Sequence, residues 1–308
     1  VPDSPERARQ RAAGREAFRA WITADGAGRF PAEGGGRYHL YVSYACPWAH
    51  RTILYRALKG LEQTVGMSVL HPRMGTPDGW TFTDSEGSTI DRAGGRRYLH
   101  EVYAAACSDY TGKVTVPVLW DRHQRTIVNN ESGEIIRMLN SEFDGVGGDR
   151  TVDYYPPALR PEIDSLNAWL LPDICSGVYA AGFAADQDRY DAAVARLFAG
   201  LDRLEDLLSD GRPFLLGDTL CEPDWHLFTT ALRFDAAYYS ALRCDIRRYA
   251  DYPRLSAHLR RMTAHPGVAA TIRLDHIKRH YYDWIGERNP TIVSVRKQEE
   301  MRDRPRFP

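Results

Sequence analysis

Tyr38-His-Leu-Tyr-Val-Ser-Tyr-Ala-Cys46-Pro-Trp-Ala-His-Arg-Thr-Ile-Leu-Tyr-Arg-Ala-Leu58 is the stretch that decides the fold of this chain. Its first residues alternate between apolar and polar, which is typical of a strand, and its later apolar residues recur at helical spacing. Cys46 and Pro47 stand where the two patterns meet. The sequence therefore predicts a strand, a turn and a helix, with a cysteine where the helix starts.

A cysteine in this position is a candidate nucleophile. Free amide donors and the helix dipole at a helix N-terminus favour the thiolate, and so lower the pKa of the thiol. Pro47 suits the first helical position because its missing N–H has no partner there. The alternative is a buried structural cysteine, since unpaired cysteine is among the most buried residue types. The strand-to-helix junction favours the chemical role.

Cys46-Pro-Trp-Ala49 resembles the active-site motif of the thioredoxin family with alanine in place of the second cysteine. An internal disulfide at this site is therefore excluded. A mixed disulfide on Cys46 needs an outside thiol to resolve it.

Composition narrows the function classes. The chain has 308 residues, which suits two domains or one large one, and 43% of them are apolar, enough for buried cores. Its formal net charge is −1, and the basic residues are dispersed among acids, so neither a nucleic acid nor a membrane partner is expected. No window approaches the ~18 apolar residues of a membrane span, and the N-terminus does not resemble a signal peptide. Cytoplasmic residence is the expectation.

The five cysteines argue against a structural role for disulfides or metal. They stand at positions 46, 107, 175, 221 and 244, with no CxxC pair and no Cys/His ligand spacing. A disulfide framework and a zinc site are both disfavoured. We expect no metal.

Five regions follow from the pattern along the chain: an N-terminal arm (1–36), a thioredoxin-like thiol-binding domain (37–142), a linker (143–157), an all-helical substrate domain (158–285) and a polar, basic tail (286–308), which we expect to be loosely ordered. In the α/β domain, residues 67–71 predict a second strand, 99–107 a helix, and 113–121 with 125–129 a hairpin. The expected order is β-α-β-α-β-β.

Two residues in this domain, Trp80 and Pro117, are candidates for a functional role. Trp80 lies in the long polar loop 72–97, where an exposed tryptophan serves as a lid or stacking platform, or else as a peripheral packing anchor. Pro117 interrupts a β-branched run and must lie at an edge or a special peptide bond. In thioredoxin-like folds this proline is cis and faces the cysteine, which leaves the backbone of the preceding residue, here Val116, free to pair with substrate.

Glu131 and Ser132 open an amphipathic helix that runs to Leu139. Free amides at a helix N-terminus bind a carboxylate, and Glu131 can take an ammonium; a γ-glutamyl group offers both. Helix capping alone explains the two residues equally well.

The second half of the chain is helical. Apolar residues three and four apart predict helices at 161–175, 186–209, 223–239 and 253–264. Cys221-Glu-Pro-Asp224 stands where a Ser/Thr-x-x-Asp capping box is expected, and a thiol is a poor acceptor. We expect Asp224 to supply the remaining half of the cap.

The finer motifs resemble the glutathionyl-hydroquinone reductases, the Xi class of the glutathione transferases. They are Cys46-Pro-Trp-Ala-His-Arg51, Gly79-Trp80, Val114-Thr-Val-Pro-Val-Leu-Trp-Asp121, Asn130-Glu-Ser-Gly-Glu-Ile-Ile-Arg-Met138, Gly177-Val-Tyr-Ala-Ala-Gly-Phe183 and Asp275-His-Ile-Lys-Arg-His-Tyr-Tyr282. The resemblance implies a thioredoxin-like domain followed by an all-helical one, and a homodimer.

The same resemblance assigns roles to individual residues. It implies that Cys46 is the nucleophile, that Tyr179 and Tyr281 act on the hydroquinone, and that Tyr282 lies beside them. The residues implied to hold glutathione are Trp80, Lys113, Val116, Pro117, Glu131 and Ser132. Family members often have Arg where Lys113 stands and Ser where Gly133 stands, and lysine lacks the bidentate fork that arginine offers a carboxylate.

The function implied is reductive deglutathionylation: a glutathionyl-hydroquinone, or a related thiol conjugate, is reduced with glutathione as co-substrate through a Cys46 mixed disulfide. One alternative is a thioltransferase or dehydroascorbate reductase of the omega type. Another is the same chemistry with a different low-molecular-weight thiol. A third is a non-catalytic interaction protein, since transferase-like domains are reused as scaffolds.

Overall fold

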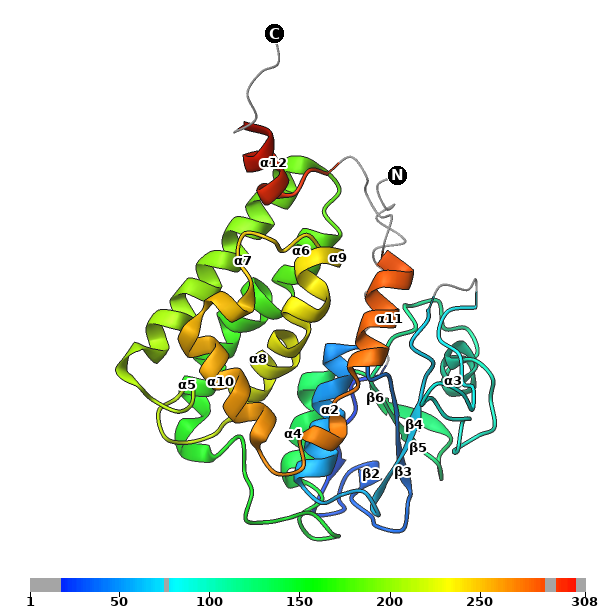
Figure 1. The fold of residues 1–308 in the computed structure, drawn as a ribbon. Helices are drawn as coiled ribbons and strands as arrows, with labels where there is room; N and C mark the ends of the chain where they lie inside the picture. The colour runs from blue at the N-terminus through cyan, green and yellow to red at the C-terminus, as the bar shows by residue number, and fades with distance from the viewer. Residues whose placement is uncertain (1–17, 75–77, 286–291, 303–308) are drawn as a thin grey trace. The chain divides into compact units, whose positions relative to one another are not determined.

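A computed structural model of the chain describes residues 18–74, 78–285 and 292–302, which form two compact units (Figure 1). The first unit runs to Asp153 and also contains Pro266–Arg273. The second contains Tyr154–His265 and the residues from Leu274 onward. The predicted helical domain, 158–285, thus includes a short segment that packs with the first unit instead.

That segment is held by a buried hydrogen bond. The short 3-10 helix η6 (Ala269–Thr271) packs on α2 (Pro47–Leu58), and Thr271 Oγ1 lies 2.9 Å from His50 Nε2. Gly267, with φ of +85°, turns the chain where the preceding helix ends. The sequence around this segment is helical and does not indicate that the segment packs with the first unit, because a hydrogen bond between residues so far apart leaves no local pattern.

The first unit is built on one mixed sheet. Its strands are β3 (Tyr38–Val42), β4 (Val65–Val69), β5 (Val118–Asp121) and β6 (Thr126–Asn129), and its other helices are α3 (Leu99–Ala106) and α4 (Ser132–Ser141). The strand order is β4-β3-β5-β6, with β3 parallel to β4 and the other pairs antiparallel. Helices α2 and α4 lie on one face of the sheet and α3 on the other (Figure 1). The predicted β-α-β-α-β-β order is confirmed.

The central strand is more buried than its alternating sequence suggests. All five residues of β3 are buried because helices cover both faces of the sheet. His39 is therefore inside, with Nε2 2.8 Å from Ser68 Oγ. The residue opposite it on β4 is Gly66, where a Cβ atom would come within 2.5 Å of His39 Nδ1. Glycine is required there for the ring to fit.

His39 makes the stability of the first unit depend on pH. Burial lowers the pKa of His39 from 6.5 to about 4. The unfolded chain therefore takes up this proton near pH 6.5, whereas the folded chain does so only near pH 4, so acidification between these values favours unfolding. From pH 7 to pH 5 we expect this group to remove about 2 kcal/mol from the free energy of unfolding.

The measurement is urea unfolding at pH 7 and pH 5 for the native chain and for His39→Gln. Other groups titrate in both proteins, so the difference between their pH slopes isolates His39. Equal slopes in the two proteins would show that the ring is not buried in its neutral form.

The N-terminal arm and the linker are both fastened to this unit. In the described part of the arm, β1 (Ile22–Thr23) pairs with β2 (Phe30–Pro31), and Arg19 bridges to Asn129 at the β6 edge. In the linker, the buried ammonium of Lys59 donates to the carbonyls of Asp149 and Val152, at 2.5 and 2.6 Å. Both segments are thus more closely bound than their glycine-rich sequences indicate.

The long loop 72–97 is also ordered from within, so far as it is described. The buried carboxylate of Asp91 accepts from the hydroxyl of Tyr41 at 3.0 Å and from backbone N–H groups that follow it, including that of Ala93 at 2.8 Å. Trp80 is only 7% exposed, and its carbonyl accepts from the N–H of Leu99 at 3.0 Å. The expectation of an exposed tryptophan is wrong, because the loop folds back on the unit.

The second unit is built from helices joined by loops, and no strand is found among its described residues. Its α-helices are α5 (Arg160–Leu170), α6 (Gly177–Gly182), α7 (Gln187–Leu207), α8 (Glu222–Arg233), α9 (Tyr239–Ala241), α10 (Pro253–Ala264), α11 (Leu274–Ile285) and α12 (Val295–Arg302). Short 3-10 turns lie at η1 (Pro157–Leu159), η3 (Leu208–Asp210) and η5 (Tyr249–Asp251), and π-helical turns at η2 (Leu171–Cys175) and η4 (Phe234–Tyr238). The predicted helical segments are confirmed, and two of them carry a π-helical turn near their C-terminal end. Pro172, which lacks an N–H, lies in the first of these turns.

The start of α8 is capped as expected, with partners the sequence did not reveal. Asp224 Oδ2 accepts from the N–H of Cys221 at 3.0 Å. Its other oxygen accepts from the N–H of Leu215 at 2.9 Å and lies 2.8 Å from His258 Nε2. This one carboxylate therefore ties together a loop and two helices.

The described part of the tail, residues 292–302, is more structured than predicted. Helix α12 lies in the region expected to be loosely ordered, and the N–H of Val295 donates to the hydroxyl of Tyr190 at 3.3 Å. Gln298 Nε2 adds a bond of 3.1 Å to Asp191 on α7. These contacts with α7, which the tail's polar composition could not indicate, hold the segment in place.

Two features are absent from the described residues. None of their helices is both long enough and apolar enough to span a bilayer. They also contain no group of three or more side chains suited to holding a metal ion.

Candidate active site

Cys46 caps the start of α2. Its backbone is extended, with φ of −79° and ψ of 123°, and its carbonyl accepts the first helical hydrogen bond, from the N–H of His50 at 2.9 Å. Pro47 occupies the first turn, as predicted. The side chain of Cys46 is partly exposed, whereas those of Cys175, Cys221 and Cys244 are buried. The structure therefore argues against reading Cys46 as a buried structural residue.

The Cys46 thiol faces the segment that precedes β5. Its Sγ atom lies 3.7 Å from the carbonyl oxygen of Val116, and the Val116–Pro117 peptide bond is cis, as predicted. Strand β5 begins only after Pro117, which has no N–H to give to the sheet. The hydroxyl of Tyr103 fixes this segment by donating to the carbonyl of Thr115 at 2.9 Å. Val116 is thus held where its backbone borders the thiol.

A cavity of about 260 Å³ opens beside this segment. It is lined by Trp48, Thr115, Val116, Pro117, Asn130, Glu131 and Ser132. Four of these were predicted from the sequence as binding residues, and they come from two separate stretches of the chain. Trp48, Thr115 and Asn130 were not singled out, although each is a sequence neighbour of a residue that was.

Electrostatics at this cavity suit a group that carries both an anion and a cation. Glu131 is the N-cap of α4, where its Oε1 accepts from the N–H of Gly133 at 3.3 Å and lies 3.4 Å from the hydroxyl of Ser132. The capping interpretation is therefore observed directly. It does not exclude ligand binding, because Ser132 in the first turn of α4 lines the cavity, where the positive end of the helix dipole favours an anion. Glu131 is exposed, and its carboxylate adds a site for a cation.

Trp48 is oriented by a cation–π contact. The guanidinium of Arg51 lies 4.3 Å from the centre of the Trp48 ring, and Arg51 itself is buried. Two predicted residues do not line the cavity. Lys113 is exposed, with its carbonyl bound to the Tyr110 hydroxyl at 2.9 Å, and Trp80 is buried within the loop. Their roles in holding a thiol ligand stay predictions.

The second unit gathers three tyrosine hydroxyls. Those of Tyr179 on α6 and Tyr281 on α11 lie 2.5 Å apart, and Tyr238 at the end of η4 lies 3.4 Å from the first and 3.3 Å from the second. Tyr281 and Tyr238 are buried, while Tyr179 is partly exposed. Tyr282 is 46% exposed and has no hydroxyl in this cluster. The structure thus joins two of the three predicted tyrosines and adds one.

Tyr238 is the member that sequence reasoning missed. Burial raises the pKa of Tyr238 well above its usual value, so its hydroxyl is protonated at any physiological pH. Its ring stands edge-on to that of Tyr281, with centroids 5.1 Å apart. The sequence gives little signal for this residue: Tyr238 and Tyr239 both end a helical segment, and only the structure shows that Tyr238 contacts Tyr281.

Two family models match this chain. The N-terminal domain of glutathione S-transferase matches residues 45–142, and the C-terminal domain of glutathione S-transferase matches residues 187–261. The first match contains Cys46 and the cavity beside it. The second contains Tyr238 but neither Tyr179 nor Tyr281.

Individual proteins give closer matches. Glutathionyl-hydroquinone reductase YqjG of Escherichia coli K12 is 48% identical, with 92% of this chain and 88% of the relative covered. The structure of YqjG with glutathione bound matches with a TM-score of 0.85 over 90% of this chain and 91% of that one. Glutathionyl-hydroquinone reductase PcpF of Sphingobium chlorophenolicum is 49% identical over 84% of this chain and 82% of its own length. A Xi-class transferase structure from Natrialba magadii is 45% identical, with a TM-score of 0.85 over 90% of this chain and 84% of that one.

Proposed function

This chain belongs to the glutathionyl-hydroquinone reductases, the Xi class of the glutathione transferases, and we propose that it reduces glutathionyl-hydroquinones to hydroquinones with glutathione as the reductant. One observation carries the proposal: a partly exposed Cys46, at a helix start, faces the Val116 carbonyl at 3.7 Å beside the cavity that Glu131 and Ser132 line.

Glutathione would lie along this cavity. The exposed carboxylate of Glu131 can pair with the γ-glutamyl ammonium, and the first N–H groups of α4, with the hydroxyl of Ser132, can receive its carboxylate. The backbone of Val116 can pair with the cysteinyl backbone of glutathione, as an added strand does. The sulfur of glutathione would then be directed toward Cys46.

The first chemical step transfers the glutathionyl group to Cys46. The substrate ring tautomerises to a ketone form that carries a new C–H bond at the carbon bonded to sulfur. The Cys46 thiolate attacks that sulfur, the S–S bond forms, the C–S bond breaks, and the bonding pair leaves with the ring as a hydroquinone anion. The ring is reduced, and the two sulfurs reach the oxidation state of a disulfide.

The second step regenerates the enzyme. A second glutathione, as thiolate, attacks the glutathionyl sulfur of the mixed disulfide, and the Cys46 thiolate leaves. The sum is one glutathionyl-hydroquinone and one glutathione converted to one hydroquinone and one oxidised glutathione. Alanine at position 49 supports the need for an outside thiol, because it leaves no resolving cysteine in the motif.

Tyrosine hydroxyls would assist the tautomerisation. Carbon is a poor leaving group unless charge on the ring oxygen is stabilised, which a positioned phenol can do. Tyr179 is the cluster member with exposed surface, and it is hydrogen-bonded to Tyr281, so a substrate oxygen would meet a pre-ordered pair. The resemblance to the family also supports the proposal that the enzyme is a homodimer, and we further propose that it resides in the cytoplasm.

Product analysis tests the proposed reaction. Purified enzyme, a glutathionyl-hydroquinone and glutathione should yield hydroquinone and oxidised glutathione in equal amounts, with ping-pong kinetics, since the enzyme alternates between a free and a glutathionylated state. Chromatography of both products gives the ratio. A small glutathione mixed disulfide serves as the parallel substrate.

The outcome also separates the alternatives. Cleavage of the mixed disulfide without cleavage of the aryl thioether would favour an omega-type thioltransferase. Activity that appears only when another low-molecular-weight thiol replaces glutathione would reassign the co-substrate. Absence of any thiol adduct on Cys46 after incubation with oxidised thiols would favour a non-catalytic protein.

A further inference from the structure

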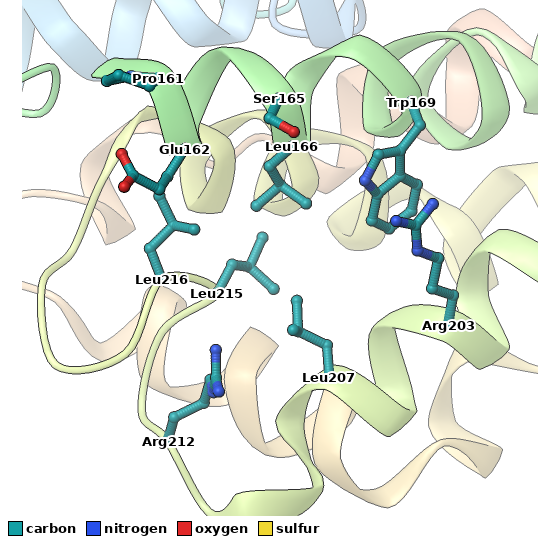
Figure 2. A pocket seen from close by; sticks show the side chains of 10 residues that line it. All are labelled: Pro161, Glu162, Ser165, Leu166, Trp169, Arg203, Leu207, Arg212, Leu215 and Leu216. Atoms are coloured by element: carbon teal, nitrogen blue, oxygen red, sulfur yellow. The ribbon is translucent and has the colours of Figure 1, made fainter. Parts of the chain in front are cut away.

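The cavity beside Cys46 is smaller than another cavity of the structure. The larger one, of about 490 Å³ against about 260 Å³, lies in the second unit between α5, α7 and the loop after η3 (Figure 2). Several leucines line it, together with the Trp169 ring, whose centre is 3.9 Å from the Arg203 guanidinium. Volume alone therefore does not explain why a peptide-like ligand such as glutathione would bind beside Cys46. The construction of the walls of that cavity does.

The cavity beside Cys46 has two walls, which come from separate stretches of the chain. Residues 115–117, which precede β5, form the strand-side wall, and residues 130–132, at the start of α4, form the helix-side wall. Glutathione, as proposed, pairs with the backbone of Val116 and with Glu131, and so contacts both walls. Its affinity then depends on how firmly the two walls are held at the right separation before it binds.

The hydroxyl of Tyr103, on α3, joins the two walls. It donates to the carbonyl oxygen of Thr115 at 2.9 Å and accepts from the N–H of Thr115 at 3.3 Å. It also accepts from the side-chain amide of Asn130, whose Nδ2 lies 3.2 Å away. Thr115 belongs to the strand-side wall and Asn130 to the helix-side wall. One phenol thus holds both walls by three hydrogen bonds.

Tyr103 is itself held firmly. Its side chain is fully buried, and its ring packs against those of Phe18 and Tyr110, with centroids 5.8 and 4.9 Å away. Burial raises the pKa of Tyr103, so its hydroxyl keeps the proton that it donates to Thr115 at neutral pH. The phenol is therefore a rigid link between the walls rather than a side chain that solvent can reorient.

We infer that Tyr103 is a positioning residue for glutathione, because it fixes the separation of the two walls and so lowers the cost of ordering them when the tripeptide binds. Among the described residues, those that line the cavity do not include Tyr103, so it acts through Thr115 and Asn130 rather than by touching the ligand. This role rests on the proposed function, since it concerns the cavity in which glutathione is proposed to lie.

Tyr103→Phe tests this role through the affinity for S-methylglutathione, which carries the tripeptide but has no free thiol to react. The substitution keeps the ring and removes all three hydrogen bonds, so calorimetry should show binding weakened about tenfold. In turnover, kcat/KM for glutathione should fall by a similar factor, while kcat at saturating substrates should change little. Alkylation of Cys46 by iodoacetamide should also keep its rate, because that rate depends on the thiolate at the start of α2.

Tyr38→Phe is the matched control. Tyr38 is as deeply buried in the same unit, and its hydroxyl donates to the carbonyl of Pro31 at 2.6 Å, a residue that does not line the cavity. The control variant should lose comparable stability in urea unfolding and keep its affinity for S-methylglutathione. Equal losses of affinity in Tyr38→Phe and Tyr103→Phe would overturn the positioning role.

Asn130→Leu is a second variant, which keeps the role falsifiable if Tyr103→Phe does not fold. Asn130 is partly exposed, and leucine has nearly its shape without the amide that donates to Tyr103. S-methylglutathione should bind this variant more weakly. In the double variant the combined loss should be less than the product of the two single losses, because both substitutions break the same link. Unchanged affinity in Asn130→Leu or in Tyr103→Phe, or single losses that simply multiply, would overturn the role.

The same binding measurements separate this role from the proposed function. Weaker S-methylglutathione binding by Tyr103→Phe, with no reduction of a glutathionyl-hydroquinone by the native chain, would support the role of Tyr103 and refute the reaction. Failure of the native chain to bind S-methylglutathione would overturn both.

Discussion

Replacing Cys46 by serine is expected to lower turnover of a glutathionyl-hydroquinone by at least about 10³-fold. A serine hydroxyl is not ionised at neutral pH and cannot form the S–S bond on which both steps depend. The measurement is the initial rate of hydroquinone release at saturating glutathione, compared with the native chain. Mass spectrometry of the native chain after incubation with oxidised glutathione should show one glutathionyl group, located on Cys46.

Cys107→Ser is the matched control for that experiment. Cys107 is the other partly exposed cysteine of the first unit, and its thiol donates to Asp109 at 3.0 Å. This hydrogen bond raises the pKa of the Cys107 thiol, so Cys107 is the less reactive of the two if the helix start activates Cys46 as proposed. The control variant should keep its activity. Substantial turnover by Cys46→Ser, or alkylation of Cys107 before Cys46 at neutral pH, would refute the assigned nucleophile.

Tyr281→Phe is expected to lower the rate with a glutathionyl-hydroquinone by about 10²-fold, the contribution usual for a group that assists proton transfer. The rate with a small glutathione mixed disulfide should change little, because a thiolate leaving group needs no tautomerisation of a ring. Removal of the hydroxyl also breaks the bonds to Tyr179 and Tyr238, at a cost of about 1 kcal/mol each, which a folded unit tolerates.

The control for Tyr281 is Tyr155→Phe. The Tyr155 hydroxyl also forms a hydrogen bond, to Asp164 at 2.7 Å, but it lies outside the tyrosine cluster. Loss of the Tyr155 hydroxyl should change the rate with neither substrate. Equal losses of both activities in Tyr281→Phe would argue that the cluster only stabilises the unit and does not act on the ring.

The sequence predicted a feature of this site well where the residues that determine the feature are close together in the chain. Cys46 at a helix start and the cap formed by Glu131 follow from residues that are neighbours in the chain, whereas the cis bond before Pro117 was implied by the likeness to thioredoxin-like folds. The helix start and the cap have local causes: the fixed φ and missing N–H of proline, and a side chain within reach of the next backbone amide. A local sequence pattern can therefore predict them.

Burial was predicted less well, because it depends on what packs from elsewhere. Trp80 was expected to be exposed on the polarity of its loop, yet the loop folds back and covers it. His39 stands at a polar position of an alternating strand, but helices on both faces of the sheet enclose it. The burial of Trp80 and of His39 cannot be predicted from the few residues on either side of each.

By itself the sequence determined the order of strands and helices in the main sheet of the first unit, the place of Cys46 at a helix start and the family to which the chain belongs. Only the tertiary structure decided which side chains converge: Tyr238 with Tyr281, Thr271 with His50, and Arg203 with Trp169. The physical reason is that backbone conformation is set mainly by near neighbours, whereas a cavity or a cluster forms where segments distant in the chain exclude water together.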